Sequence, residues 1–107
     1  MTENQAAIIL NQKLDELGFE KFWHPTKIRF NKNTVRSFRE PSEEVILEQS
    51  DIFFIDIGPV FDNHEADYGE TFVIGSDPKL VKIQNATKEI FHATQDVWKK
   101  NKLSGND

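Results

Sequence analysis

The sequence predicts an α+β domain in which two helices flank a curved antiparallel sheet built around a central hairpin. Two observations support this fold class. Apolar residues recur at helical spacing near both ends of the chain, and two β-rich segments, 51–60 and 65–74, meet at the dipeptide Asp62-Asn63. A length of 107 residues suits one domain with a modest core. We therefore expect a single domain over residues 1–107.

The first element is expected to be an amphipathic helix. Thr2 and Gln5 have the spacing of a capping box, and Gly18 can end the helix in a left-handed conformation. Between these ends, apolar residues recur at helical spacing: Ala7, Leu10, Leu14 and Leu17. This stripe predicts a helix with one buried face.

The segment that follows is expected to contain short extended pieces. Pro25 and the turn-forming run Asn31-Lys32-Asn33 interrupt it. The extended pieces are Phe22-Trp23, Ile28-Arg29-Phe30 and Val35-Arg36. Residues 39–50 are mostly polar and include a proline, so they predict a loop before the hairpin.

A long helix is expected after the hairpin. Ser76-Asp77-Pro78 has the pattern of a helix start, with proline in the first turn. An apolar stripe then follows at helical spacing: Ile83, Ala86, Ile90, Ala93 and Val97. We expect this stripe to belong to the core, with both helices packed on the apolar face of the sheet.

Composition narrows the classes of partner. Thirteen basic and eighteen acidic residues give a net charge of −5, and the acids gather between residues 51 and 70. This argues against nucleic acid and for cations or basic groups. The absence of cysteine excludes disulfides and thiolate metal sites. No apolar run is long enough to cross a bilayer, so we expect a soluble, cytoplasmic protein without membrane contact.

Two aspartates interrupt the β-rich segments. If the hairpin turns near Phe61-Asp62, residues whose numbers sum to 123 are opposed, and Asp56 faces Asp67 with Cβ atoms about 4.5–5.5 Å apart. Because side chains alternate along a strand, their face also holds Gly58, Gly69 and Thr71. The other face is apolar. The hairpin therefore predicts an acidic hollow on one side.

Opposed carboxylates repel each other in a partly desolvated site. A shared proton or a bound cation relieves this repulsion. Carboxylate oxygens suit divalent ions such as manganese, zinc or cobalt, and carboxylate-bridged metal pairs recur in hydrolases. The alternative is that the hairpin is a sheet edge with a solvated pair. Pro59 favours that alternative, since it cannot donate to a sheet and implies an edge or a bulge.

The hairpin sequence IDIGPVF…EADYGETFVIG resembles the first metal-binding hairpin of the pita-bread metallopeptidases, which include methionine aminopeptidase, aminopeptidase P, prolidase and creatinase. Upstream, WHPTKIRFNKNT is similar to a bacterial branch close to aminopeptidase P. The resemblance implies that Asp56 and Asp67, eleven positions apart, hold divalent metal: manganese, cobalt or zinc. It also implies one half of a pita-bread domain and hydrolysis of Xaa-Pro-type peptides at their N-terminus.

The same resemblance implies an incomplete centre. The family's other ligands, a histidine and two glutamates, come from the second half of the fold, and we expect a truncated or split form that is inactive alone. A homo-oligomer or a second chain supplying the missing half is then expected as partner, with a peptide as substrate. The alternatives are a non-catalytic module that binds peptides or proteins, and a truncated product without activity.

The remaining candidates have supporting roles. The resemblance implies substrate-binding or supporting positions for His24 and Thr71 near the metal. His64 is expected to be exposed in the hairpin turn, and His92 is expected on a helix flank. Glu70 stands where the family pattern implies arginine, which adds negative charge to the site.

Overall fold

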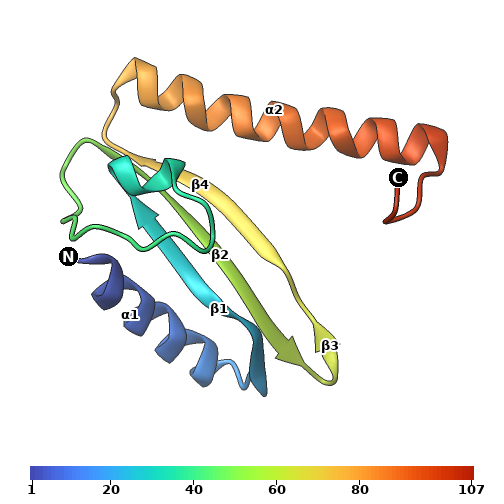
Figure 1. The fold of residues 1–107 in the computed structure, drawn as a ribbon, viewed down its shortest axis with the longest axis horizontal. Helices are drawn as coiled ribbons and strands as arrows, with labels where there is room; N and C mark the ends of the chain where they lie inside the picture. Colours follow the sequence, from blue (N-terminus) through green and yellow to red (C-terminus); the bar gives the residue numbers. More distant parts are fainter.

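The computed structural model describes residues 1–107 and has the predicted α+β architecture (Figure 1). All strand pairings are antiparallel, and the long second strand lies in the middle of the sheet. This is an antiparallel sheet with two helices, consistent with half of a pita-bread domain. In chain order the elements are α1 (Glu3–Glu16), β1 (Lys21–Phe30), the 3-10 helix η1 (Asn31–Val35), β2 (Asp51–Phe61), β3 (His64–Glu65), β4 (Tyr68–Ile74) and α2 (Pro78–Asn101).

Helix α1 begins and ends as predicted. The Thr2 hydroxyl accepts the backbone N–H of Gln5 at 3.2 Å, and the Gln5 side chain accepts the N–H of Thr2 at 2.9 Å. Gly18, with φ of 82°, takes the left-handed conformation that follows the helix. Leu14 is the one buried residue of α1, which lies against β1.

The core is thin, because only ten of the 107 residues are buried. A row of aromatic rings runs from the buried Phe30 on β1 across β2 and β4. Phe30 meets Phe53 with ring centroids 6.0 Å apart, and Phe53 stacks on Phe72 at 5.2 Å. Such pairs contribute about 0.5–1.5 kcal/mol beyond the area they bury. They hold the three strands together on the face that α1 covers.

Strand β1 differs from the prediction of separate extended pieces. It runs continuously through Pro25, and two irregularities in its pairing with β2 lie between Phe22 and His24 and between His24 and Lys27. A proline is tolerated here because β1 is an edge strand and β-bulges absorb the missing N–H. The predicted extended piece at Val35 is also wrong, since Val35 ends η1.

The hairpin turns where predicted but with a different register. Asp62 and Asn63 both have positive φ, 46° and 61°, as a two-residue turn requires. This turn pairs Phe61 with His64, so opposed residue numbers sum to 125 rather than 123. Asp56 is therefore opposite Gly69, and the predicted direct opposition of Asp56 and Asp67 is wrong. A shift of two residues leaves every side chain on its predicted face.

The second hairpin strand is broken. Residues 65–74, predicted as one strand, form β3 and β4, and Ala66 and Asp67 lie between them. The break lies beside Pro59, which has no N–H to donate, although its carbonyl accepts the Ala66 N–H at 2.8 Å. Asp67 therefore lies outside the regular ladder.

Helix α2 has the predicted start, because the Asp77 side chain accepts the N–H of Lys79 at 2.8 Å. The predicted packing of its apolar stripe is wrong. Ile83, Ile90 and Val97 are 51%, 66% and 54% exposed, and α2 has no buried residue. The reason is that α2 lies beyond the β4 edge instead of on the apolar face (Figure 1).

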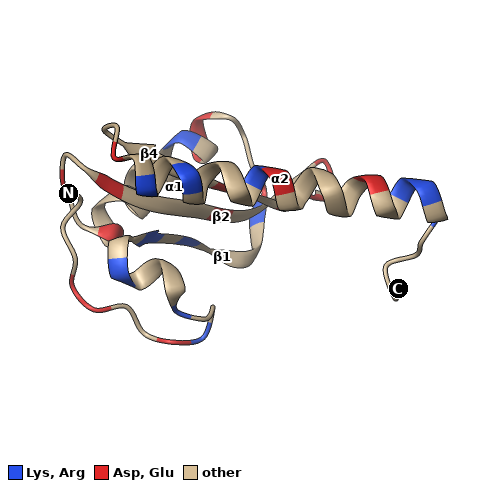
Figure 2. Ribbon diagram, turned by 90° about the horizontal axis from the view of Figure 1, so that it is seen from above, with Lys and Arg blue, Asp and Glu red and all other residues tan.

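The length of α2 also contributes to the exposure of its apolar side chains. A helix of 24 residues is about 36 Å long, whereas a strand of seven residues spans only about 24 Å. Figure 2 shows the helix reaching past the sheet, with lysines at its far end. Gln84 ties α2 to the sheet edge by donating to the Thr71 carbonyl at 3.2 Å. Neither helix combines the length and apolar character that a bilayer-spanning helix needs.

Candidate metal centre

Three side chains with metal-binding atoms converge on one face of the sheet. His24 Nε2 lies 3.6 Å from Asp56 Oδ1 and 3.8 Å from Asp67 Oδ1. One donor atom from each residue lies within 4.8 Å of the other two. This is the one group of three or more histidine and acidic side chains in the chain that is arranged in this way. The two aspartates thus come together although they are not directly opposed.

The two carboxylates differ in their setting. Asp56 lies in the middle of β2, opposite Gly69, and its side chain is 35% exposed. Asp67 lies in the break between β3 and β4, and its side chain is 67% exposed. One carboxylate is therefore held by a strand that is paired on both sides, and the other is free to adjust.

The bulge in β1 positions the histidine. Phe22 pairs with Pro59 and His24 pairs with Gly58, so Trp23 is the extra residue between two ladder positions. Trp23 Nε1 donates to the Ala66 carbonyl at 2.7 Å, beside Asp67. The indole also contacts the imidazole of His24 edge-on at 4.4 Å. The bulge therefore connects β1 to the break that carries the second carboxylate.

Hydrogen bonding orients the imidazole. His24 Nδ1 lies 2.9 Å from the carbonyl oxygen of Pro25. A carbonyl oxygen can only accept, so Nδ1 carries the proton and donates it. In the neutral ring, Nε2 then presents its lone pair to the two carboxylates. The side chain is only 13% exposed, so this orientation is held by packing.

The cluster holds two carboxylates, and neither pairs with a lysine or an arginine. Lys27 is the ladder partner of Asp56, yet its Nζ lies over the Phe38 ring, 4.9 Å from the centroid, and makes no ion pair with Asp56. Two carboxylate oxygens and one imidazole nitrogen are donors that suit borderline divalent ions. The residues present therefore fit a divalent metal.

A hollow of about 700 Å³ opens beside the carboxylates, between β2, β4 and α2. Thr71 and His92 line this hollow but are not in the three-residue cluster. The Tyr68 hydroxyl donates to the Glu70 carboxylate, and this hydrogen bond raises the pKa of Tyr68. The lining residues are Phe54, Ile55, Asp56, Asp67, Tyr68, Gly69, Glu70, Thr71, Thr87, Lys88, Phe91 and His92.

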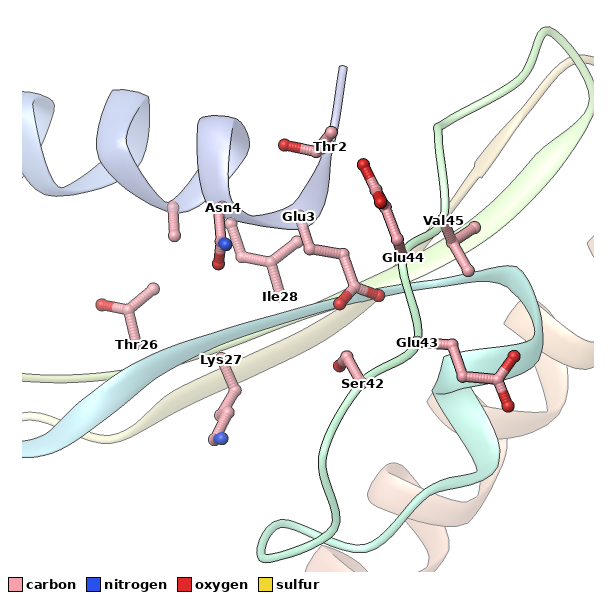
Figure 3. Close-up of a pocket in the computed structure, with 11 residues that line it drawn as sticks. Thr2, Glu3, Asn4, Thr26, Lys27, Ile28, Ser42, Glu43, Glu44 and Val45 are labelled. Carbon is pink, nitrogen blue, oxygen red and sulfur yellow. The ribbon is translucent and has the colours of Figure 1, made fainter.

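A second hollow, of about 530 Å³, lies between α1, β1 and residues 42–45, and neither aspartate lines it (Figure 3). Glu3 reaches from α1 toward β1, where its Oε1 accepts the Phe30 N–H at 2.7 Å and the Asn33 side chain at 2.8 Å. Asn33 is fully buried and also bonds to the backbone of Glu43. This region joins α1, η1 and the loop, and its contacts are structural.

The other histidines stand apart from the cluster. His64 is exposed beside the hairpin turn, where its Nδ1 lies 2.6 Å from the Asp62 carbonyl. His92 is exposed on α2.

Sequence reasoning did not find the contact of His24 with both carboxylates. Two sequence features could have indicated this contact. Pro25, next to His24, favours an irregular strand, and Gly58 leaves room above β2.

Comparison with known families agrees with this geometry. The sequence pattern of metallopeptidase family M24 matches the chain over residues 1–107. No curated protein and no solved structure matches it. Members of this family generally use divalent metals, in accord with the paired carboxylates of the hairpin. With the whole sequence matched and the antiparallel sheet and two helices in place, the chain belongs to metallopeptidase family M24.

Proposed function

We propose that this chain carries the aspartate half of a metal centre that hydrolyses Xaa-Pro-type peptides at their N-terminus. The observation that carries the proposal is the convergence of Asp56 and Asp67 beside an open hollow. In this proposal the two carboxylates hold the ion, and His24 and Thr71 flank it. Manganese, cobalt and zinc are the expected ions, since all three accept carboxylate ligands.

The hollow has the chemistry to receive the end of a peptide. Phe54, Tyr68 and Phe91 give it aromatic walls, and its acidic residues attract a free α-amino group. A divalent ion bound at the carboxylates would supply Lewis-acid catalysis of amide hydrolysis. The side chains of the hollow would orient the peptide and hold its N-terminus close to Asp67.

We further propose that the centre is inactive without additional ligands. The three-residue cluster contains no further carboxylate to act as a general base. A histidine and two glutamates, supplied by a second chain or a further segment, would complete it. The purified chain is therefore expected to bind manganese, cobalt or zinc without turning over Xaa-Pro peptides.

Thermal melts with chelator and with manganese test this proposal. A ligand present at about 100 times its Kd stabilises the native state by about 2.7 kcal/mol. Manganese should raise the melting temperature of the parent and do much less for Asp56→Asn or Asp67→Asn. Asp15→Asn, which removes an exposed carboxylate on α1, is the control. Equal shifts in all four proteins would refute the metal site, and turnover by the parent alone that is lost in Asp56→Ala would refute the incomplete centre.

A non-catalytic peptide-binding module is the second candidate. Glu70 lines the hollow at the position where the family resemblance implies arginine, and its carboxylate is engaged by Tyr68. An added negative charge would favour capture of basic peptide ends over the family's usual chemistry. The two candidate functions can be distinguished by adding a separately expressed domain that contains the second half of the M24 fold, with its histidine and two glutamates. Peptide binding that persists without hydrolysis in the completed assembly would favour the binding module.

A further inference from the structure

We propose that His24 is itself a metal ligand, so that this chain offers a three-donor site made of one imidazole and two carboxylates. This inference rests on the proposed function, because it concerns the ion held by Asp56 and Asp67. It changes the expected role of His24 from a flanking residue to a direct ligand. Four features of the structure support it.

The first feature is the tautomer. The hydrogen bond from Nδ1 to the Pro25 carbonyl, 2.9 Å long, leaves Nε2 as the free nitrogen. Metal-ligating histidines characteristically donate their other ring N–H to a carbonyl or carboxylate, which fixes the ring and raises its basicity. His24 has this arrangement before any ion is bound.

The second feature is the position of Nε2. Donor atoms that share one divalent ion at about 2.0–2.2 Å lie about 3–4 Å from one another. The separations of 3.6 Å and 3.8 Å from Nε2 to Asp56 and Asp67 fall in this range. The exposed Asp67 side chain can close the remaining carboxylate distance by rotation.

The third feature is the room made for the ring. Gly58 is the ladder partner of His24, and a Cβ added there would lie 2.4 Å from His24 Cδ2 and 2.6 Å from Nε2. The imidazole therefore lies across β2 in space that any other residue at position 58 would fill. With the β2–β4 register extended by one residue beyond Ile57 and Tyr68, position 58 lies opposite Asp67. The absence of a side chain at Gly58 therefore lets the His24 imidazole on β1 approach the Asp67 carboxylate.

The fourth feature is the enclosure of the ring. Trp23 contacts it edge-on at 4.4 Å and Phe38 edge-on at 5.9 Å. These rings shield Nε2, which makes no hydrogen bond, and leave the side chain only 13% exposed. An imidazole donor also favours zinc, cobalt or manganese over magnesium and calcium, which prefer sites made of oxygen alone.

Pulsed EPR of manganese bound to the purified chain tests the inference directly, with calorimetry to measure affinity. We expect nitrogen hyperfine coupling in the parent and its loss in His24→Ala. Affinity should fall by more than the roughly 10–100-fold that loss of a supporting residue costs. His64→Ala is the matched control, because His64 also has its Nδ1 on a backbone carbonyl but lies outside the cluster.

The outcomes separate this inference from the proposed function. Binding without nitrogen coupling, weakened by Asp56→Asn but not by His24→Ala, would overturn the inference and leave the proposed function standing. Coupling that is lost in His64→Ala would also overturn it. No manganese binding by the parent would overturn both. If His24→Ala does not fold, the coupling in the parent and its persistence in both His64→Ala and His92→Ala decide the question, because His64 and His92 are the other two histidines of the chain.

Discussion

Replacement of Gly58 by alanine should disturb both the stability of the protein and the orientation of His24. The new Cβ would lie 2.4 Å from His24 Cδ2 and 2.9 Å from Trp23 Nε1. Because carbon atoms pack at about 3.5–4.0 Å, the imidazole must retreat by about 1 Å. That movement breaks the alignment of Nδ1 with the Pro25 carbonyl.

The size of the effect follows from three contributions. Overpacking of this kind costs about 1–3 kcal/mol, and the loss of one hydrogen bond costs about 1 kcal/mol. Alanine in a strand regains about 0.5–1 kcal/mol through its lower backbone entropy when unfolded. The net destabilisation is therefore about 2 kcal/mol. At about 4–8 °C per kcal/mol for a domain of this size, the melting temperature should fall by about 8–16 °C.

Gly69→Ala provides the matched control on the same hairpin. A Cβ at position 69 meets nothing closer than the Ile55 carbonyl oxygen at 3.7 Å. Circular-dichroism melts of both variants in chelator measure stability without any contribution from metal. Gly69→Ala should melt at or slightly above the parent. Melting of the two variants within about 2 °C of each other, where a gap of about 8 °C or more is expected, would refute the reasoning about the imidazole.

A double-mutant cycle identifies the clashing group. In the His24→Ala background the ring is gone, and Trp23 Nε1 is the remaining close atom, at 2.9 Å. Gly58→Ala should then cost at most half of what it costs in the parent. An undiminished cost would place the clash elsewhere in β1.

Three other regions yield predictions. Asn33→Ala should cost about 2–4 kcal/mol in urea unfolding, because it removes the hydrogen bond to the Glu3 carboxylate and both hydrogen bonds to the Glu43 backbone, whose N–H and carbonyl lose the partner that the buried amide supplies. A cost below about 1 kcal/mol would contradict this. The hydrogen bond from Lys32 holds the pKa of Glu43 below its ordinary value of 4.5. The Lys32–Glu43 interaction therefore stabilises the protein above pH 4.5, and this stabilisation is lost as the pH falls through the lower folded-state pKa of Glu43. Glu43→Gln should make the melting temperature less dependent on pH on the acid side. An unchanged pH dependence would argue against the ion pair. The exposed apolar stripe of α2 should drive association into a homodimer or larger oligomer, weakened by Ile90→Asp in light scattering; a monomeric parent at high concentration would refute this.

The hairpin shows how far the sequence could be interpreted. Alternation along the strands was enough to assign side chains to faces, because a register error of two residues preserves sidedness. The error itself came from the turn, since placing it one residue too early moved Asp67 directly opposite Asp56. Both central residues, Asp62 and Asn63, have left-handed backbones, and only their joint conformation determines that Phe61 pairs with His64.

His24 and α2 were beyond sequence reasoning for different reasons. The position of His24 depends on the bulge at Trp23 and on the missing side chain of Gly58, which are far apart in the sequence and meet only when β1 pairs with β2. Helical periodicity identified the apolar stripe of α2 correctly, but periodicity does not specify what a stripe packs against. Here the helix lies past the edge of a narrow sheet, so its apolar side chains remain exposed.

The break in the hairpin at Ala66 and Asp67 would affect the rates at which a divalent ion binds to the proposed site and dissociates from it. Asp56 and His24 are restrained by strand pairing and packing, whereas Asp67 lies in the break between β3 and β4 and its side chain is 67% exposed. In the proposed site, Asp67 would be the donor most accessible to an incoming divalent ion, and Asp56 and His24 would complete the ligand set. Dissociation would follow the reverse path. Ion exchange at the proposed site would then depend on the rotation of the Asp67 side chain.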